Sequence, residues 1–323
     1  ESGMVGSIIQ RPYAVVANPD DTPKAIFISA FSDMPLAADV NVALKGKEAD
    51  FQTGVDALAK IAPVHIGVNP GNILAGTKNA TVTEYQGKCP AGNVGVQINN
   101  TCPVNKGEVV WTLAAEEVAI IGRLFNEGKA ILQRTIAVAG SEIKEPQYKT
   151  ITVGAKIDDI VAGNVKTDKK VRLIDGNPLT GMQTSQDAFL LAHSTEVTAI
   201  PEGDDADELF GWIAPRFNEF STSRSYFTWL QPKNKEYILD ARVKGGHRHM
   251  IFSGEYDSVF PMDIYPEQLV KAIISGDIDR MEALGIYEVA PEDFAVAEFV
   301  DSSKVELQRI VREGLDMLRK ENE

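Results

Sequence analysis

Cysteine is scarce in this chain, since only Cys89 and Cys102 occur among its 323 residues. Two thiols are too few for a disulfide framework, and we expect both to be reduced in a cytoplasmic protein. An iron–sulfur cluster needs four thiolates or close substitutes, usually with three at Cys-x-x-Cys-x-x-Cys spacing, so this pair cannot supply one. For Cys89 a structural thiol is favoured over a redox thiol or a cluster shared with a partner, and the residues leave a redox role of either cysteine open.

Long apolar runs and glycine-rich phosphate loops are absent as well. No apolar run approaches the roughly 20 residues that a membrane-spanning helix needs, so we expect no membrane span. There is no Gly-x-x-x-x-Gly-Lys-Ser/Thr sequence, and no Gly-x-Gly-x-x-Gly follows the apolar run 25–30, whose turn reads Phe31-Ser32-Asp33-Met34-Pro35. The glycines of 92–95 and 176–181 are interpreted as turn residues. The sequence therefore predicts no nucleotide-binding loop.

Basic residues are outnumbered by acidic ones, 32 to 46, which gives a net charge of −14. The excess lies mainly in residues 201–323, which hold 25 acidic and 14 basic residues. Such a field repels a phosphate backbone and an anionic lipid surface, so nucleic-acid binding and polybasic membrane anchoring are disfavoured. A protein partner or a small ligand fits better. The apolar content of 44% is typical of a folded chain, whose length suggests two or three domains.

Residues 1–149 alternate short apolar runs with helical patterns. Strands are predicted at 25–30, 64–68, 80–85, 109–113 and 135–140. Helices are predicted over 51–61, with Phe51, Val55, Leu58 and Ile61 on one face, and over 116–127, where Gly128 can cap the end. Buried strands that alternate with helices predict a mostly parallel sheet covered on both faces, an α/β domain of Rossmann-like type.

Residues 150–202 have a different texture, with short β segments around one short helix. Strands are predicted at 149–153, 170–174 and 196–200, with a helical turn at 158–161. This pattern predicts a small β-grasp-like module. Residues 203–262 are irregular, and there we expect one hairpin, in which a strand 237–243 turns at Gly245-Gly246 into 247–252.

A helical domain is predicted over residues 263–323. Pro266 stands where the first turn of a helix tolerates proline, Asp277 can cap a second helix, and Pro291 can start a third. Ser303-x-x-Glu306 predicts a capping box before a last amphipathic helix. The chain is thus expected to end in a compact group of helices.

Four histidines are available for metal binding or acid–base chemistry. His247 and His249 alternate on the expected hairpin, where they could bind a metal with help from Asp257 or Glu255. An exposed hairpin without a metal is the favoured interpretation, because no third and fourth ligand stand at motif spacing. His65 is expected in the core with one hydrogen bond, and His193 is given no role.

Clusters of acidic and aromatic side chains occur between 202 and 229. The acidic residues are Glu202, Asp204, Asp205, Asp207 and Glu208. Their mutual repulsion favours a solvated loop or a docking edge over a catalytic pair. The aromatic residues are Phe217, Phe220, Tyr226, Phe227 and Trp229. We favour packing between domains for these rings, with a partner-binding surface as the alternative.

Several strings, taken in order and spacing over essentially the whole chain, resemble the A subunit of the bacterial sodium-translocating NADH:quinone reductase. They are Arg11-Pro12-Tyr13, Ala25-Ile26-Phe27-Ile28-Ser29-Ala30 with Pro35-Leu36-Ala37, Asp50-Phe51-x-x-Gly54, Pro90-Ala91-Gly92, Val110-Trp111-Thr112, Ile120-Ile121-Gly122-Arg123-Leu124-Phe125, Leu209-Phe210-Gly211-Trp212-Ile213-Ala214-Pro215, Tyr256 to Pro266, and Pro291-Glu292-Asp293-Phe294-Ala295.

The resemblance implies a peripheral subunit on the cytoplasmic face of the bacterial inner membrane, in a complex that oxidises NADH, reduces ubiquinone and exports sodium ions. Its modules resemble the flavin-binding subunit of respiratory complex I and the C subunit of the Rnf complex, with an SLBB-type β-grasp module and a ferredoxin-type cluster domain. Where those relatives have cluster cysteines, this chain has Ala297 and residues 299–304. The start, Glu1-Ser2-Gly3-Met4, is expected to begin a fragment that lacks an N-terminal lipoyl-carrier-like domain.

We therefore expect this subunit to contribute to quinone reduction and assembly without a redox cofactor of its own. NADH, flavins, an iron–sulfur cluster and ubiquinone are expected on other subunits, and sodium ions are met only through the complex. No catalytic, cofactor-binding or metal-binding residue is assigned. The sequence leaves open whether this chain contacts ubiquinone. Such a contact is expected at apolar surface between the sheet domain and the β-grasp module. The alternative is a stand-alone flavin- or nucleotide-dependent dehydrogenase.

Overall fold

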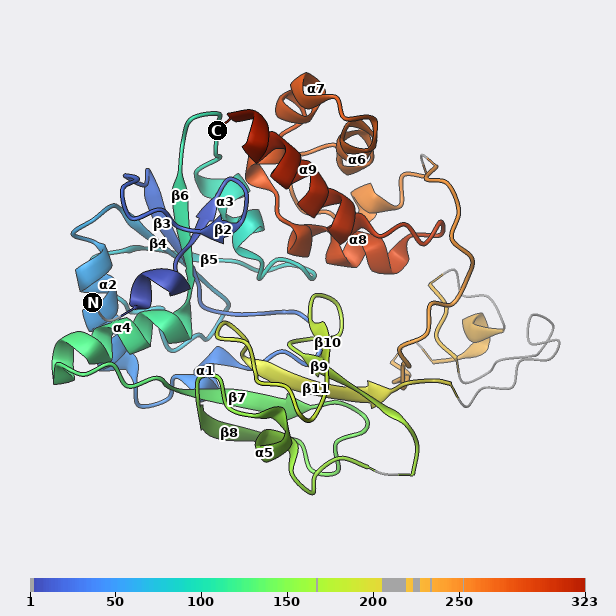
Figure 1. Ribbon diagram of the computed structural model, residues 1–323, viewed down its shortest axis with the longest axis horizontal. Helices are drawn as coiled ribbons and strands as arrows, with labels where there is room; N and C mark the ends of the chain where they lie inside the picture. Colours follow the sequence, from blue (N-terminus) through green and yellow to red (C-terminus); the bar gives the residue numbers. More distant parts are fainter. Residues whose placement is uncertain are drawn as a thin grey trace.

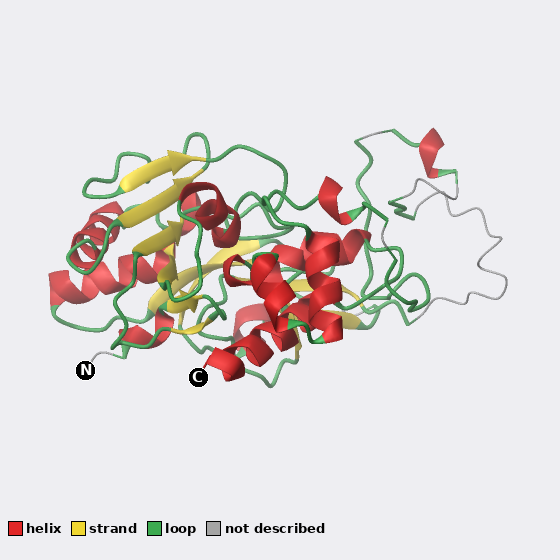
Figure 2. Ribbon diagram, turned by 90° about the horizontal axis from the view of Figure 1, so that it is seen from above, coloured by secondary structure: helices red, strands yellow, loops and turns green. Residues whose placement is uncertain are grey.

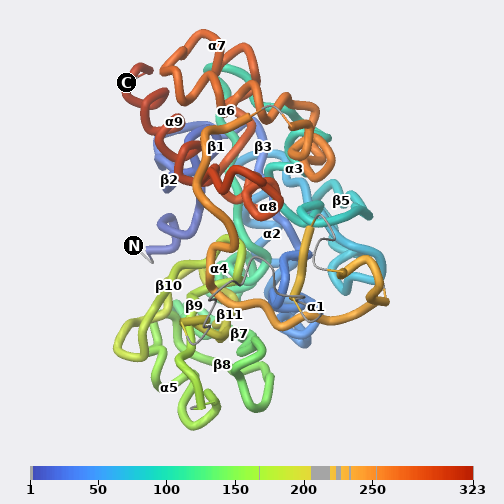
Figure 3. Tube along the Cα trace, turned by 90° about the vertical axis from the view of Figure 1, so that its right-hand side faces the viewer, coloured from blue at the N-terminus to red at the C-terminus, as the bar shows by residue number. Residues whose placement is uncertain are grey.

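The computed structural model describes residues 3–166, 168–204, 219–222, 227–232, 234–251 and 253–322. Two mixed sheets and a group of helices at the C-terminal end make up the molecule (Figure 1). In Figure 3 the first sheet lies between the second sheet at the lower end and the C-terminal helices at the upper end. The expected mixture of strands and helices is confirmed.

The first sheet contains six strands, which are β1 (Ile9–Arg11), β2 (Val15–Val16), β3 (Ala25–Ser29), β4 (Val64–Val68), β5 (Thr81–Glu84) and β6 (Val110–Ala114). Their order is β2-β1-β6-β3-β4-β5. The four strands predicted between 25 and 113 are confirmed, and they run parallel to one another. The short β1 and β2 add an antiparallel edge beside β6.

Helices cover both faces of this sheet, as the sequence predicts. They are α1 (Val40–Ala43), α2 (Glu48–Leu58), α3 (Val94–Thr101) and α4 (Ala115–Glu127), after a short 3-10 turn η1 (Met4–Ser7). Ile26 and Ile28 of β3 pack in the core with Phe51 of α2, whereas Phe27 points to the opposite face, toward Ile98 of α3. This division explains why β3 is an unbroken apolar run, because both of its faces are buried.

Two details of α2 and α4 test the predicted helix ends. Gly128 caps α4 with φ of 68°, a left-handed conformation that glycine adopts without strain, so its predicted role is confirmed. Ile61 was expected on the buried face of α2, but that helix ends at Leu58 and Ile61 is 52% exposed. The prediction that Ile61 lies on the buried face is wrong, because Ile61 lies beyond the end of the helix and the helical spacing does not apply to it.

The second sheet contains five strands in the order β10-β9-β11-β7-β8. They are β7 (Gln133–Ala139), β8 (Gln147–Thr152), β9 (Val171–Asp175), β10 (Met182–Thr184) and β11 (Glu196–Pro201), and α5 (Ile157–Val161) packs on them. The strand expected to close the first sheet is β7, and its placement was wrong: it pairs with β11 and β8. The change of sheet thus falls before Gln133, ahead of residue 149.

The described residues 234–251 form no strand, so the predicted hairpin is wrong. Ile238 is 72% exposed, and the alternating apolar side chains of this segment face no sheet. Its backbone bonds elsewhere instead, with Ala241 N donating to the Pro201 carbonyl and Arg248 N to the Ser303 carbonyl. Figure 2 shows this stretch as loop at the side of the molecule, near the short turns η2 (Thr228–Leu230) and η3 (Tyr256–Ser258).

The C-terminal helices share a core of their own. They are α6 (Pro266–Ser275), α7 (Ile278–Ala283), η4 (Ile286–Glu288), η5 (Pro291–Phe294), α8 (Ala295–Val300) and α9 (Leu307–Asn322). Pro266 begins α6 and Pro291 begins η5, as predicted. Asp277 caps α7 by accepting a hydrogen bond from Arg280 N, which confirms its predicted role.

The predicted capping box at Ser303 is wrong, because α9 begins only at Leu307. Ser303 is buried, and its backbone N–H donates to Asp301. The first turn of α9 is capped instead by a carboxylate from α8. Glu298 Oε2 accepts a hydrogen bond from Gln308 N at 2.8 Å. The cap of this helix is therefore a tertiary contact rather than a local one.

Candidate functional site

The carboxyl ends of the parallel strands form the first place to look for a site. Along the chain, β3 is the first of the four parallel strands. In the sheet it lies between β4, the second strand, and β6, the last. The direction of winding reverses between β3 and β6, and open α/β sheets bind ligands in the crevice at such a switch point. The residues that follow β3 and β6 therefore decide what this sheet can hold.

On the side of β3, the protein's own side chains occupy this edge. Ser29 Oγ donates to the carbonyl of Gly92 at 2.7 Å. Gln97 of α3 is buried, and its Nε2 donates to Ser29 Oγ at 2.9 Å. The loop before α3 is thus fastened to the end of β3, where a nucleotide-binding sheet would have an open glycine-rich turn.

On the side of β6, five buried or half-buried polar residues from both sheets meet, and we call them the polar junction. They are Glu116 and Glu117 in the first turn of α4, Arg134 of β7, His193 in the loop before β11, and Glu196 of β11. All except His193 are buried, and the His193 side chain is 47% exposed.

Glu117 is the centre of the polar junction. Its Oε1 lies 2.7 Å from His193 Nδ1 and 3.7 Å from Arg134 Nη2. Its Oε2 accepts a hydrogen bond from Ala114 N at 3.2 Å, which closes the N-terminus of α4. The Glu117 carboxylate thus binds the backbone at the end of β6 in the first sheet and two side chains from the second-sheet part of the chain.

Two further contacts tie the second sheet to this point. Arg134 Nη1 donates to the carbonyls of Ala192 at 2.7 Å and Ser194 at 3.1 Å, on either side of His193. Glu196 Oε2 accepts a hydrogen bond from Ala38 N at 3.3 Å, in the segment that follows β3. The crevice at the switch point is therefore closed by the second sheet.

Burial and neighbouring charge shift the titration of this cluster. Burial raises the pKa of Glu116, which favours its neutral form. The hydrogen bond with Glu117 raises the pKa of His193, against the opposing effect of burial. Burial lowers the pKa of Lys47, which lines a small cavity between α4 and β7.

A dinucleotide or flavin does not fit these residues. The turn after β3 is filled by side chains, and phosphates at the N-terminus of α4, on the other side of the switch point, would meet the carboxyl groups of Glu116, Glu117 and Glu196. The cavity beside them has a volume of about 10 Å³, which holds at most one water molecule. The polar junction lies between the two sheets, where apolar surface for a quinone was expected, and the contact with ubiquinone stays a prediction.

A second buried cluster joins the first sheet to the C-terminal helices, and we call it the Arg11 cluster. Arg11 Nη1 lies 3.2 Å from Asp293 Oδ2, and Arg11 Nη2 lies 2.7 Å from Glu292 Oε1. Asn93 Nδ2 donates to Asp293 Oδ1 at 3.0 Å. Burial raises the pKa of Asp293, and the charge of Arg11 opposes that shift. Three of the strings that carry the resemblance, around residues 11, 92 and 293, therefore meet at one point.

Gly95 belongs to this cluster, and its interpretation as a turn residue is wrong. It lies inside α3, and a Cβ atom there would be 2.4 Å from Asp293 Oδ2. Gly95 is needed for the close approach of α3 to Asp293. Gly176, with φ of 98°, is a turn residue as predicted.

The two cysteines and the predicted metal ligands lie apart from both clusters. Burial raises the pKa of Cys89 to about 11, which makes its thiolate scarce at neutral pH. His247 Nδ1 lies 2.9 Å from the carbonyl of Lys304. Among the described residues, no group of three or more His, Cys, Asp or Glu side chains is placed to hold a metal ion.

His65 stacks on Phe27 at 4.8 Å between ring centroids, and its Nδ1 has no hydrogen-bond partner among the described residues. His65 was expected in the core, but it is only half-buried in β4. Stacking on a buried ring, rather than a polar contact, holds this histidine.

The acidic and aromatic clusters are only partly within the described residues. Glu202 accepts from Arg172 Nε at 2.9 Å, and Asp204 pairs with Lys170. The Phe220 ring lies 5.8 Å from Phe299 of α8, which agrees with packing between domains, while Trp229 is 60% exposed. The residues outside the description are Asp205, Asp207, Glu208, Phe217 and Tyr226.

The segment 297–304, where the resemblance led us to expect the replaced cluster cysteines, is held by its own contacts. Ala297 is buried in the helical core. Asp301 Oδ1 accepts from Ser303 N at 3.1 Å, and Asp301 Oδ2 accepts from Val305 N at 2.7 Å. An iron–sulfur cluster does not fit, because no side chain of this segment is a thiolate.

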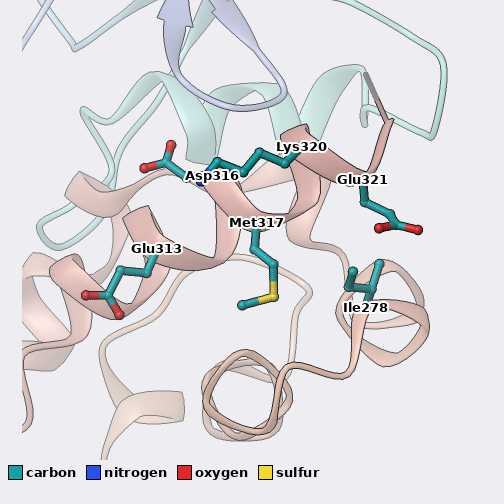
Figure 4. Close-up of a pocket in the computed structure, with 6 residues that line it drawn as sticks. All are labelled: Ile278, Glu313, Asp316, Met317, Lys320 and Glu321. Atoms are coloured by element: carbon teal, nitrogen blue, oxygen red, sulfur yellow. The ribbon is translucent and has the colours of Figure 1, made fainter.

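An open hollow of about 500 Å³ lies between α7 and α9 (Figure 4). In Figure 4, the side chain of Met317 of α9 extends downward, Ile278 of α7 lies to its right, and Glu313, Asp316 and Glu321 lie around them. The carboxylates of Glu313 and Asp316 pair with arginines of the same helix. This hollow is a feature of the helix surface without groups that suggest chemistry.

Sequence reasoning missed the polar junction, although part of its signal was visible. Two glutamates stand directly after a buried strand and before the apolar stretch 118–122 of α4, and Arg134 stands just before the apolar run 136–139 of β7. Nothing in the sequence pairs them with His193, because that contact spans 76 positions of the chain.

No helix among the described residues is both long and apolar enough to cross a membrane. Comparison with known families matches residues 1–130 to the NqrA second alpha/beta domain and residues 135–186 to the NQRA C-terminal domain. The boundary between these two matches coincides with the change of sheet before β7.

Curated relatives match almost the whole chain. The A subunit of the Na(+)-translocating NADH-quinone reductase of Alcanivorax borkumensis is 35% identical, over 99% of this chain and 72% of that protein. The corresponding protein of Serratia proteamaculans is 35% identical with the same coverage, and that of Neisseria meningitidis serogroup B is 34% identical. A solved structure of an air-oxidized NAD+-reducing [NiFe]-hydrogenase covers 93% of this chain and 60% of its own, at 12% identity and a TM-score of 0.44.

The identity to these relatives extends over both sheets and the C-terminal helices. The strings that meet in the Arg11 cluster and the two family matches agree with it. The chain therefore belongs to the NqrA family, the A subunits of the Na+-translocating NADH-quinone reductase, an enzyme complex of several subunits.

Proposed function

We propose that this chain supports quinone reduction and the assembly of the reductase as a peripheral subunit on the cytoplasmic face of the membrane, without a redox cofactor of its own. The polar junction is the observation that carries the proposal. Three carboxyl groups and the second sheet fill the crevice in which an α/β sheet of this order binds a dinucleotide. A flavin or NADH would have to displace paired buried charges to enter.

The finer architecture follows the same reasoning. The parallel order of β3, β4, β5 and β6 supports a Rossmann-like origin of the first sheet. The second sheet with α5 fits a β-grasp-like SLBB module, and the C-terminal helices fit a cluster domain without its cysteines. Each part has kept a scaffold while its cofactor contacts are replaced by polar or apolar packing.

The partners in this proposal are the other subunits of the reductase. NADH, the flavins, the iron–sulfur cluster and ubiquinone are bound there, and sodium ions pass through those subunits. The names of the relatives support this assignment, because they describe a sodium-translocating NADH-quinone reductase. A direct contact of this chain with ubiquinone would need a surface other than the polar junction.

The test separates the two half-reactions of the complex. The reductase is assembled with and without this chain, and NADH oxidation by ferricyanide is measured beside the reduction of a short-chain ubiquinone. We expect the ferricyanide rate to remain and the quinone rate to fall at least tenfold without the chain. Equal loss of both rates, or an unchanged quinone rate, would contradict the proposal.

The alternative of a stand-alone dehydrogenase is tested on the purified chain. It requires saturable binding of flavin mononucleotide or NADH, visible as flavin absorbance after desalting or as heat in a titration. We expect neither, because the side chains of the polar junction occupy the place that the phosphates would need. Tight binding of either nucleotide would revive this alternative.

A further inference from the structure

The loop that precedes β11 is held to the first sheet by side chains of the polar junction. Arg134 binds the carbonyls on both sides of His193, and the ring of His193 binds Glu117 of α4. In the same loop, Ser194 Oγ binds Asp175 of β9, and Leu191 N donates to the other oxygen of Asp175 at 2.8 Å. The loop is thus fixed to its own sheet by Asp175 and to α4 by the pair of His193 and Glu117.

The charge balance of the polar junction depends on His193. The charged and titratable groups of the polar junction and of the elements packed against it are Glu116 and Glu117 of α4, Arg134 of β7, Asp175 of β9, Glu196 of β11, and Lys47 beside Glu116. Burial favours the neutral form of Glu116, and Arg134 is the one permanent cation of this set. A protonated His193 therefore supplies a second positive charge beside Glu117, whose carboxylate is buried.

His193 is placed to exchange this proton with water. Its side chain is 47% exposed, whereas that of Glu117 is 5% exposed. The proton can therefore enter and leave without unfolding of either sheet. The bond to Glu117 is charge-assisted when the imidazole is protonated, and it weakens when the imidazole is neutral.

We propose that the polar junction is a proton-controlled latch, in which protonation of His193 fastens the loop before β11 to the N-terminus of α4. The direction of the effect follows from the contact. The bond to Glu117 raises the pKa of His193 in the folded chain above its ordinary value near 6.5. The stabilisation is complete below that ordinary value and is lost as the pH rises through the raised value. The latch is therefore closed in mild acid and loosens in mild alkali.

The first measurement is the titration of His193 itself. Nuclear magnetic resonance of the full chain labelled at histidine Cε1 gives a titration curve for each of the four histidines. We expect the pKa of His193 to lie above 6.5 and to fall in Glu117→Gln, which keeps the hydrogen-bonding oxygen and removes the charge. A pKa of His193 at or below 6.5 in the native chain overturns the proposal, whether or not any variant folds.

The second measurement follows the latch. Hydrogen exchange, corrected for the intrinsic effect of pH, is compared between pH 6 and pH 9 for residues 114–118 and 192–196. We expect protection to fall roughly two- to fivefold in the native chain, the size of one partly exposed ion pair. In His193→Gln this change should vanish, while His249→Gln, a substitution of an exposed histidine, should keep it. The same pH dependence in His193→Gln would refute the latch.

Discussion

Replacement of Arg11 by methionine tests the view that a buried ion pair fastens the C-terminal helices to the first sheet. Methionine has a similar length, so the substitution removes the charge and leaves most of the packing. Both Arg11 and Asp293 are buried, and their atoms lie 3.2 Å apart. Loss of Arg11 leaves the Asp293 carboxylate buried without its counter-charge, which costs about 3–5 kcal/mol. Glu292, whose side chain is 40% exposed, adds little to this sum.

Protonation of Asp293 limits the loss. Burial already raises its pKa, and removal of Arg11 raises that pKa further, so the carboxyl group becomes neutral before the full cost is reached. We therefore expect a loss of about 3 kcal/mol in the free energy of unfolding at neutral pH, measured by urea denaturation and circular dichroism. The loss should be smaller in mild acid, where the neutral carboxyl group is already favoured.

Two further variants make this result decisive. The double variant Arg11→Met with Asp293→Asn removes both charges and should recover about 1–2 kcal/mol of the loss. Arg309→Met breaks an ion-pair network on α9 whose arginine is 60% exposed, and it should cost less than about 1 kcal/mol. If Arg11→Met costs no more than Arg309→Met, the reasoning about the Arg11 cluster is refuted.

Three more predictions follow from single contacts. Gly95→Ala puts a Cβ atom 2.4 Å from Asp293 and should destabilise the fold by about 1–3 kcal/mol in a thermal melt. Gly76→Ala, which has open space around it, should cost less than about 1 kcal/mol. Equal losses in the two variants would contradict the close approach of α3 to Asp293. Cys89, with its pKa raised to about 11, should react with iodoacetamide at pH 8 roughly 100-fold more slowly in the folded chain than in urea, as mass spectrometry of its peptide would show. Similar rates would argue against a raised pKa of this half-buried thiol. Glu298→Ala removes the carboxylate that accepts the hydrogen bond from Gln308 N, and it should lower the free energy of unfolding by about 1 kcal/mol. Hydrogen exchange at the start of α9 should become faster. Unchanged exchange there would count against this cap.

The sequence by itself determined the local structure wherever one pattern had one solution. The mostly apolar runs of β3, β4 and β6 required burial on both faces, and that requirement predicts a parallel sheet between two layers of helices. Asp277 and Gly128 fixed helix ends because a cap depends on neighbours within a turn of the chain.

Only the tertiary structure decided which elements share a sheet and which charges meet. The pattern of β7 is compatible with either sheet, and its pairing with β11 settles its place. Arg11 and Asp293 are 282 positions apart, and His193 and Glu117 are 76 apart. The spacing of residues along the chain carries no information about such pairs, because they form only when separately folded elements pack and exclude water from the charges between them. The contacts of the polar junction at the end of β6 are of this long-range kind.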